Sequence, residues 1–379
     1  MSPRPAARAP VLTLRELNRA SLARQMLLER ASLPVVTAIE RLAALQAQWA
    51  PSPYLALWSR LENFERENLW NAIEKTHAVV RARLMRGTLH LVSARDFFAY
   101  AVATQDLQRG AWNRLQVGRG VDPKAVAKLA VAFARQPRLK EEVVAHLTEH
   151  LGSFGGPYKW LIWRFVSAHA DLVSAPPGGH WRHGGTNAPY VAARHWIGGG
   201  SRPSEDDALR LLIRRYLAAF GPASLADIAQ FAGQVPARIR PVLEKLGSSL
   251  RRFSDEQRHV LFDLPRAPRP TADTTAPVRF LPRYDELLIG YEHRDRVIAA
   301  KHRPAVYSKN AIIEAVFLVD GWAAGTWALT TTKSDSVIRI RPFGRLARAD
   351  RAAAVEEGEA LARFMAPDAK THGARIGRT

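Results

Sequence analysis

Apolar residues recur along most of the chain with the three- and four-residue spacing of amphipathic helices, and short alternating runs interrupt them. The clearest stretch begins at Ser204, a residue type that commonly caps helix N-termini, and it stops at Gly221-Pro222. The apolar stripe of this stretch consists of Leu209, Leu212, Tyr216 and Phe220. The pattern therefore predicts a helix between Ser204 and Gly221.

Two further helices and a hairpin are predicted directly after it. Ser224 precedes a short helix over Leu225–Phe231, and Pro236 opens another over Ala237–Leu246. The two strand-like runs that follow are Leu250–Ser254 and Arg258–Leu264. This order of elements is typical of a winged helix-turn-helix, which usually binds DNA and in other proteins mediates protein contacts.

The preceding residues repeat the outline of helices followed by extended runs. The first predicted helices are Thr13–Leu28, Pro34–Gln46, Pro53–Asn63 and Arg66–Thr76, and a strand pair follows over Val79–Leu84 and Thr88–Val92. The next predicted helices are Pro123–Arg135, Leu139–Leu151 and Pro157–Ala170, with Asp122 as an N-cap, and they lead to an irregular stretch and an extended run over Tyr190–Ile197.

The C-terminal part contains the strongest hairpin signal in the sequence. Asp320-Gly321 separates two apolar runs, and both central positions of such a turn need a positive φ. The predicted elements here are the strands Val316–Val319, Trp322–Leu329 and Ser336–Arg341 and a closing helix, Ala349–Phe364.

These elements predict an α+β protein, mostly α, built from tandem winged helix-turn-helix motifs and a C-terminal segment with a β-hairpin. The predicted organisation is a basic tail (1–10), a helical and winged-helix segment (11–118), a second winged-helix-like segment (119–200), a third winged helix (204–266), a hairpin and helix segment (277–366) and a second basic tail (367–379).

Charge narrows the class of partner. The chain carries 55 basic and 35 acidic residues, a formal net charge of +20, which favours a polyanion such as double-stranded DNA over a neutral partner. Residues 236–270 alone carry eight basic and four acidic side chains. The absence of cysteine excludes a disulfide framework, a zinc finger and a thiol nucleophile. No secretory or membrane-spanning stretch is evident, so we expect a cytoplasmic, nucleoid-associated protein without a membrane partner.

The usual catalytic signatures are missing, including the phosphate-binding glycine loop and the metalloprotease and α/β-hydrolase motifs. His180 and His183 lack a third ligand in their loop, so the expectation is no metal. No organic cofactor is implied either.

Gln46-Ala47-Gln48 is the most unusual spot. Gln46 falls where the apolar stripe of the predicted helix through Leu42 would continue. Either the hydrophobic core stops at this position, or the Gln46 side chain faces a cavity. If the chain extends after Gln46, the two amides share a face, whereas in a continued helix they diverge. Alternatively, both amides cap the helix end or bond to backbone.

Two other groups could carry chemistry. Thr88 and His90 share one face if Arg86-Gly87-Thr88-Leu89-His90 is a strand, where they form either a functional pair or a surface cross-strand pair. Asp285 and Glu286 follow Arg283, where an arginine–aspartate ion pair is the simplest interpretation.

Five stretches of the sequence, in order along nearly the whole chain, resemble the AlkZ-like family of bacterial winged-helix DNA glycosylases. They are LQAQWAPSPYLALWSRL, RGTLHLV, FGPASLADIAQFAG, LPRYDELLIGY and LVDGWAAGTW. The family's catalytic motif is glutamine, an aliphatic residue, then glutamine or aspartate, and it stands here as Gln46-Ala47-Gln48. The second glutamine resembles the AlkZ branch, and alanine is small for the middle position.

The resemblance implies a C-shaped basic channel around DNA and hydrolysis of the N-glycosidic bond of alkylated purines by Gln46 and Gln48. It implies a monofunctional, monomeric enzyme that acts on cationic N7-alkylguanine-type lesions and unhooks interstrand crosslinks. The DNA contacts expected on this basis are Arg83, Arg86, Thr88, His90, Arg238, Arg240, Arg251, Arg252 and Arg283. The alternatives are a non-catalytic winged-helix transcriptional regulator and a binder that shields lesions without cutting them.

Overall fold

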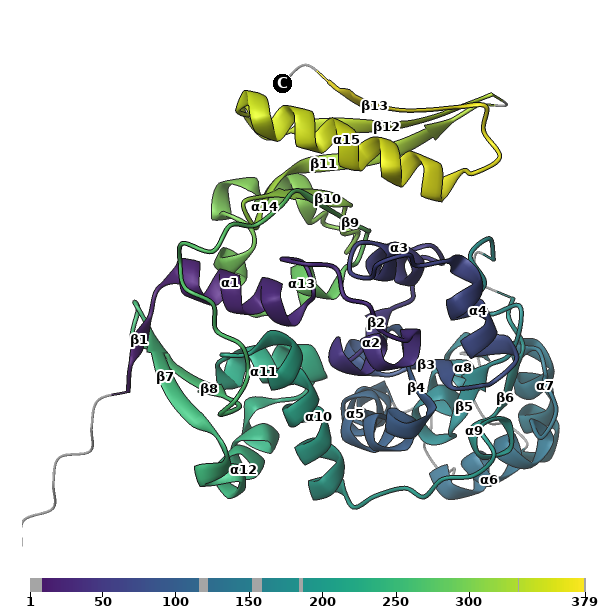
Figure 1. The fold of residues 1–379 in the computed structure, drawn as a ribbon. Coiled ribbons are helices and arrows are strands. Elements are labelled where there is room, and N and C mark those ends of the chain that lie inside the picture. The colour runs from purple at the N-terminus through teal and green to yellow at the C-terminus, as the bar shows by residue number, and fades with distance from the viewer. Residues whose placement is uncertain (1–8, 116–121, 152–158, 184–186, 333, 378–379) are drawn as a thin grey trace, which may run out of the picture.

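Three β-sheets organise the part of the chain that the computed structural model describes, which is residues 9–115, 122–151, 159–183, 187–332 and 334–377. Their strand orders are β1-β7-β8, β2-β4-β3-β5-β6 and β13-β12-β11-β10-β9. Figure 1 shows the last sheet at one end of the molecule, covered by α15, with the other two sheets and most helices in the body below it. The molecule is thus an α+β protein, as the sequence predicts.

The N-terminal part contributes a mixture of short strands and helices. Its elements are β1 (Val11–Leu12), α1 (Leu14–Arg24), α2 (Val35–Arg41), β2 (Leu45–Gln46), α3 (Ser52–Trp58), α4 (Arg66–Glu74), β3 (Val79–Arg83), the 3₁₀ turn η1 (Met85–Gly87), β4 (Leu89–Ser93) and α5 (Ala94–Leu115). Thr13 and Glu16 form a capping box at the start of α1.

The structure of this part differs from the prediction at one predicted helix and at one helix that was not predicted. The helix predicted to reach Gln46 ends at Arg41, because Ala43 adopts a positive φ of 66° and the following residues pair with β4. The 22-residue helix α5 was not predicted. Its residues 97–101 are all buried, so the sequence shows no polar face there from which a helical period could be recognised.

The next part completes the second sheet. Its elements are α6 (Pro123–Phe133), α7 (Lys140–Leu151), α8 (Lys159–His169), β5 (Leu172–Ser174), β6 (Tyr190–Ala192) and α9 (Ala193–Trp196). Only the first three residues of the extended run predicted over 190–197 are a strand. Because β5 pairs with β3, this sheet is shared by the first two predicted segments. Asp122 caps α6, as predicted.

The third part follows its prediction most closely. Its elements are α10 (Glu205–Phe220), α11 (Leu225–Ala232), α12 (Pro236–Leu246), the 3₁₀ turn η3 (Gly247–Ser249), β7 (Arg251–Asp255) and β8 (Val260–Asp263). Ser204 and Ser224 cap α10 and α11, as predicted. The match is close because α10 and α11 begin at capping serines, α12 begins with a proline, and each helix has a one-sided apolar stripe. Helix α10 packs against α5 in the centre of the body (Figure 1).

The C-terminal part contains the third sheet. Its elements are β9 (Arg279–Leu281), α13 (Glu286–Ile289), η4 (Arg294–Arg296), η5 (Ala300–His302), α14 (Arg303–Val306), β10 (Val316–Val319), β11 (Trp322–Thr331), β12 (Asp335–Pro342), α15 (Arg348–Met365) and β13 (Thr371–Ile376). The Asp320-Gly321 hairpin is confirmed. Residues 371–376, predicted as part of a basic tail, instead form β13 parallel to β12. Most of the other predicted tail, residues 1–8, lies outside the described residues.

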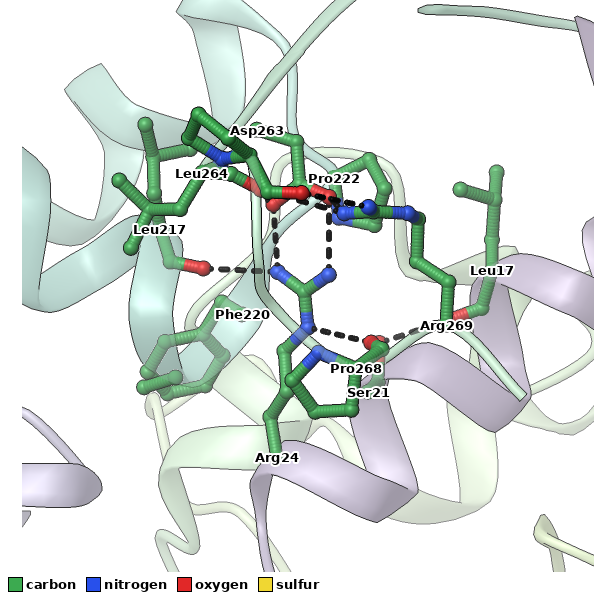
Figure 2. A network of polar contacts seen from close by, with 12 residues as sticks. Leu17, Ser21, Arg24, Leu217, Phe220, Pro222, Asp263, Leu264, Pro268 and Arg269 are labelled. Atoms are coloured by element: carbon green, nitrogen blue, oxygen red, sulfur yellow. Dashed lines mark hydrogen bonds and ion pairs between the residues drawn. The ribbon is translucent and has the colours of Figure 1, made fainter. Parts of the chain in front are cut away.

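A buried ion network joins the N-terminal helix to the third part (Figure 2). The guanidinium of Arg24 makes two hydrogen bonds to the carboxylate of Asp263, 2.7 and 2.9 Å long, and both side chains are buried. Arg24 also donates to the carbonyls of Leu217 and Pro268, and Arg269 pairs with Asp263. The network fixes α1 against α10 and β8. Within the described residues, no helix is both long enough and apolar enough to cross a bilayer.

Candidate active site

Gln46 occupies the last position of β2, at the edge of the second sheet. Its backbone pairs with His90 of β4, and the amide N–H of Ala47 continues the pairing by donating to the carbonyl of Leu89. Cross-strand partners point to the same face of a sheet, as do residues two apart on one strand. Gln46 and His90 therefore share one face, and Thr88, just before β4, lies within reach of the Gln46 amide. The strand considered over Arg86–His90 is wrong in its first half, because Met85–Gly87 form the 3₁₀ turn η1 and β4 begins at Leu89.

The amide of Gln46 is only half satisfied. Its Nε2 donates to the hydroxyl of Thr88 over 3.4 Å, and the residue as a whole is 7% exposed. Its carbonyl oxygen Oε1 is buried without a hydrogen-bond partner among the described residues. A buried acceptor without a partner is rare, because an unsatisfied polar group costs about 1–3 kcal/mol. The oxygen therefore keeps its capacity to accept a hydrogen bond, although it is covered in the DNA-free protein.

Gln48 differs from Gln46 in its surroundings. It lies in a bend after β2, is exposed, and makes no side-chain hydrogen bond within the described residues. The helix-capping alternative is wrong for both glutamines, since α2 ends at Arg41, before either of them. No hydrogen bond joins the two amides in the described structure.

Arg81 holds the backbone of the motif, and the sequence analysis missed it. Its Nε and Nη2 donate to the carbonyl of Ala47 over 3.3 and 3.2 Å, and its Nη1 is buried without a partner in the described part of the chain. Burial lowers the pKa of Arg81 below its usual range. The only signal in the sequence is an arginine between the apolar residues Val80 and Ala82 of β3, and that pattern is common on exposed strands as well.

His90 lies in a buried ion network with Arg86 and Glu286. Its Nε2 is 3.0 Å from Oε1 of Glu286, and Arg86 Nη2 donates to both oxygens of that carboxylate over 2.7 and 2.9 Å. Burial lowers the pKa of His90 below its usual value. Burial by itself would raise the pKa of Glu286, but Arg86 and the hydrogen bond with His90 outweigh it and lower the pKa.

The turn that carries Arg86 is docked on α11. Arg86 has a φ of 53°, and its Nη1 donates to the carbonyl of Phe231 near the C-terminus of that helix. Gly233, the C-cap of α11, has a φ of 65°, and a Cβ there would lie 2.6 Å from the backbone nitrogen of Arg86. Only glycine allows this close approach.

The segment between β9 and α13 brings further residues to the motif. Arg283 lies 6.0 Å from the ring of Trp49 and pairs with Glu314, and its backbone carbonyl accepts a hydrogen bond from Ser52. The predicted arginine–aspartate ion pair at Asp285 exists, but its partner is Arg60. Both members of that pair are buried, so it anchors α13 rather than facing a substrate.

Two of the predicted DNA contacts on the β3–β4 hairpin are corrected. His90 is 0% exposed, so no surface remains for DNA to touch. The charge of Arg86 is neutralised by Glu286, and its side chain is 15% exposed. Arg83 is partly buried and donates to the carbonyl of Gly87, and burial lowers its pKa. Thr88 lies inside the site, beside Gln46.

The arginines of the third part that were predicted to contact DNA differ in exposure and in ion pairing. Arg238 pairs with Glu205 at the start of α10. Arg240 is exposed on α12. Arg251 and Arg252 are exposed on β7, where they lie over the rings of Phe253 and Phe262 respectively. The last three remain available to a polyanion.

His180 and His183, the two histidines considered as metal ligands, have different surroundings. His180 contacts the edge of Trp70, and His183 Nε2 is buried without a partner in the described structure. Neither belongs to a group of three potential ligands among the described residues. The group that does meet this criterion is His146, Glu149 and His150 on α7, which carries none of the predicted site residues.

Comparison with known proteins identifies the fold and the family. The model of the AlkZ-like DNA glycosylase family matches residues 39–364 of this chain. The chain belongs to the AlkZ-like DNA glycosylase family. The match spans both glutamines of the motif and the Arg86–His90–Glu286 network, so the site described above lies inside the family's shared region, and the molecule is a DNA glycosylase.

Two comparisons extend this family assignment. An interstrand DNA cross-link repair glycosylase of Streptomyces sahachiroi is 26% identical over 344 residues, covering 84% of this chain and 88% of the relative. The solved structure of the Streptomyces sahachiroi DNA glycosylase AlkZ superposes with a TM-score of 0.79 at 21% identity, covering 97% of this chain and all of that one. The second comparison shows a shared fold.

Proposed function

We propose that this glycosylase is a monofunctional hydrolase of cationic alkylated purines of the N7-alkylguanine type, with Gln46 and Gln48 as its catalytic residues. The observation that carries the proposal is the amide of Gln46. Thr88 accepts a hydrogen bond from its nitrogen, and its buried carbonyl oxygen has no partner among the residues that the structure describes. An oriented acceptor in a water-poor site stabilises positive charge far better than the same group in water.

The chemistry of the lesion matches such a site. A purine alkylated at N7 is already cationic and leaves without protonation, so the sugar becomes positively charged as the bond breaks. The protein then has to face that charge with oxygen dipoles and hold a water molecule for attack. Amide carbonyls do both, and protonation at ordinary pH does not silence them.

The two glutamines differ in exposure, which suggests different parts in the reaction. Gln48 is exposed and meets the lesion first. The carbonyl of Gln46 is covered in the DNA-free protein, so a nucleotide turned out of the duplex must displace what covers it before the oxygen faces the sugar or the water. Release of a crosslinked purine breaks the same bond but needs a wider active-site opening. The Streptomyces relative is named as an interstrand cross-link repair glycosylase, which supports testing such substrates.

We further propose that the helices α10–α12 with the strands β7 and β8 form a winged helix, and that a C-shaped channel holds the DNA. The exposed Arg240, Arg251 and Arg252 support a phosphate-binding role for this part. Arg283, beside Trp49, is the proposed DNA contact nearest the motif. The protein is proposed to work as a monomer without a cofactor or metal.

The test uses a duplex oligonucleotide with a single N7-methylguanine, incubated with the protein and then treated with alkali. Strand cleavage at that base is expected for the native protein. Gln46→Ala and Gln48→Ala are expected to lower turnover by about 100-fold or more while DNA affinity is retained. Unchanged turnover in both variants would remove the motif from the mechanism. Binding without cleavage of methylated and crosslinked duplexes would favour a lesion-shielding protein, and a sequence-specific footprint would favour a regulator.

A further inference from the structure

The orientation of the Gln46 amide is decided by Thr88. The Thr88 hydroxyl lies 3.3 Å from the carbonyl of Met85, the same carbonyl that accepts the backbone N–H of Thr88. The hydroxyl has a single proton, and donation to Met85 uses it. What remains toward Gln46 is a lone pair, which accepts only from the NH₂ end of the amide. The carbonyl end of Gln46 is therefore turned away from Thr88.

The position of Thr88 is fixed from its other side by His90. The Nδ1 atom of His90 lies 3.0 Å from the backbone carbonyl of Thr88, which also accepts the amide N–H of Leu84. His90 is completely buried, and its other nitrogen is held by Glu286. The ring therefore connects the carboxylate of Glu286 on α13 to the peptide unit of Thr88.

Glu286 reaches this point from a distant part of the chain. It is 4% exposed, and Asp285, the N-cap of α13, is fixed by the buried ion pair with Arg60. Arg86, which completes the network, is docked on α11 through the carbonyl of Phe231. A continuous line of contacts thus runs from Glu286 through His90 and Thr88 to the free carbonyl oxygen of Gln46.

We propose that Glu286 is a positioning residue of this glycosylase, which sets through His90 and Thr88 which end of the Gln46 amide faces the lesion. The inference rests on the proposed function of Gln46. The simpler alternative is that Glu286 only balances the charge of Arg86 and holds the β3–β4 turn on α11. The two ideas differ in what a neutral residue at position 286 does to turnover by correctly folded protein.

The first experiment measures kcat and KM on the N7-methylguanine duplex for Glu286→Gln, with rates normalised to folded protein by circular dichroism. A fall in kcat of about 10- to 100-fold at unchanged KM is expected, because a small misplacement of a reacting group has effects of this size. The matched control is Asp263→Asn, an equally buried carboxylate bound by arginines but outside the site. Its kcat per folded molecule is expected to equal that of the native protein.

A double-mutant cycle adds a readout that a structural role does not move. If Glu286 acts through Gln46, then Gln46→Ala combined with Glu286→Gln is no slower than Gln46→Ala alone. Multiplicative losses, or a Glu286→Gln variant with native kcat, would overturn the proposal while leaving the role of Gln46 intact. If the native protein releases no base, the proposed function is wrong. The role of Glu286 is then tested by a measurement that does not depend on activity.

That measurement is independent of activity. Selective ¹⁵N labelling of glutamine gives side-chain NH₂ resonances, and the Gln46 pair is assigned by its loss in Gln46→Ala. Glu286→Gln is expected to shift or broaden this pair, since the Thr88 hydroxyl no longer holds it in one orientation, whereas Asp263→Asn leaves it in place. A Gln46 resonance that is unchanged in Glu286→Gln contradicts the proposal.

Discussion

The Arg24–Asp263 and Arg86–Glu286 networks are both buried, and each ties together segments that lie far apart in the sequence, but they end differently. In the first, both carboxylate oxygens of Asp263 are bonded to Arg24, and the remaining donors of Arg24 find backbone carbonyls (Figure 2). The second continues through His90 and Thr88 to the amide oxygen of Gln46, which has no partner within the described structure. A closed network stabilises the fold, and an open one leaves an acceptor for a ligand.

The difference shows how a functional site can be distinguished from a purely structural cluster of buried polar residues. Burial and ion pairing are shared by the two networks, so neither property distinguishes them. The unpaired oxygen of Gln46 does, because it belongs to the glutamine motif, whereas other buried unpaired atoms of the described residues, such as Nε of Arg60, lie outside that motif. The predictions below change one network at a time.

The largest expected effect is that of Asp263→Ala on stability. The substitution leaves Arg24 and Arg269 without their carboxylate in a buried environment, and removal of one partner of a buried pair costs about 3–5 kcal/mol. Urea unfolding followed by tryptophan fluorescence measures the loss. Base release per folded molecule is expected to stay native, and a specific fall in kcat would show that the two networks are not separate.

Thr88→Val is expected to lower kcat while changing stability little, the reverse of Asp263→Ala. Valine has the shape of threonine without the hydroxyl, so it removes the acceptor for Gln46 Nε2 and leaves β4 intact. We expect kcat on the methylated duplex to fall about tenfold, equivalent to about 1.4 kcal/mol, with a change in unfolding free energy of about 1 kcal/mol or less. The control is Thr104→Val, which removes a buried hydroxyl that bonds within α5. Equal kcat in the two variants would contradict the orienting role of Thr88.

The exposed arginines of β7 provide a comparison outside both networks. Arg251→Ala and Arg252→Ala are each expected to reduce the slope of log affinity against log salt by about one and to leave kcat at saturating DNA unchanged. Fluorescence anisotropy with undamaged duplex at several salt concentrations measures this. Arg238→Ala serves as the control, because Arg238 is already paired with Glu205. A salt slope unaffected by both β7 variants would place the DNA elsewhere.

The smallest expected effect is that of pH on turnover. Amides do not titrate, burial lowers the pKa of His90, and the pKa of Glu286 is also lowered, so both pKa values move away from the neutral range. Because the folded-state pKa of Glu286 is depressed, its contribution to stability is complete above the usual glutamate pKa and is lost as the pH falls through the folded value. A flat profile of kcat against pH is expected. A single neutral-range ionisation that changes kcat tenfold would indicate a titrating catalytic group.

Much of the local structure could be predicted from the sequence where caps and one-sided apolar stripes define an element. The helices from Ser204 to Leu246 and the Asp320-Gly321 hairpin are of this kind. The prediction was wrong where tertiary contacts dominate. Helix α5 is buried on several sides, and the residues up to Gln46 leave their helix to pair with β4. Strand β13 exists because β12 offers it an edge.

The sequence by itself determined the α+β class, the basic charge and the glutamine motif. These features depend only on composition or on residues that are close together along the chain. Only the tertiary structure decided that Arg86 and His90 are internal and that Glu286 lies behind Thr88. These groups are about 200 residues apart along the chain, a separation at which periodicity carries no information. Their arrangement depends on how α11 and α13 dock against the β3–β4 turn, and that docking is set by packing of the whole core.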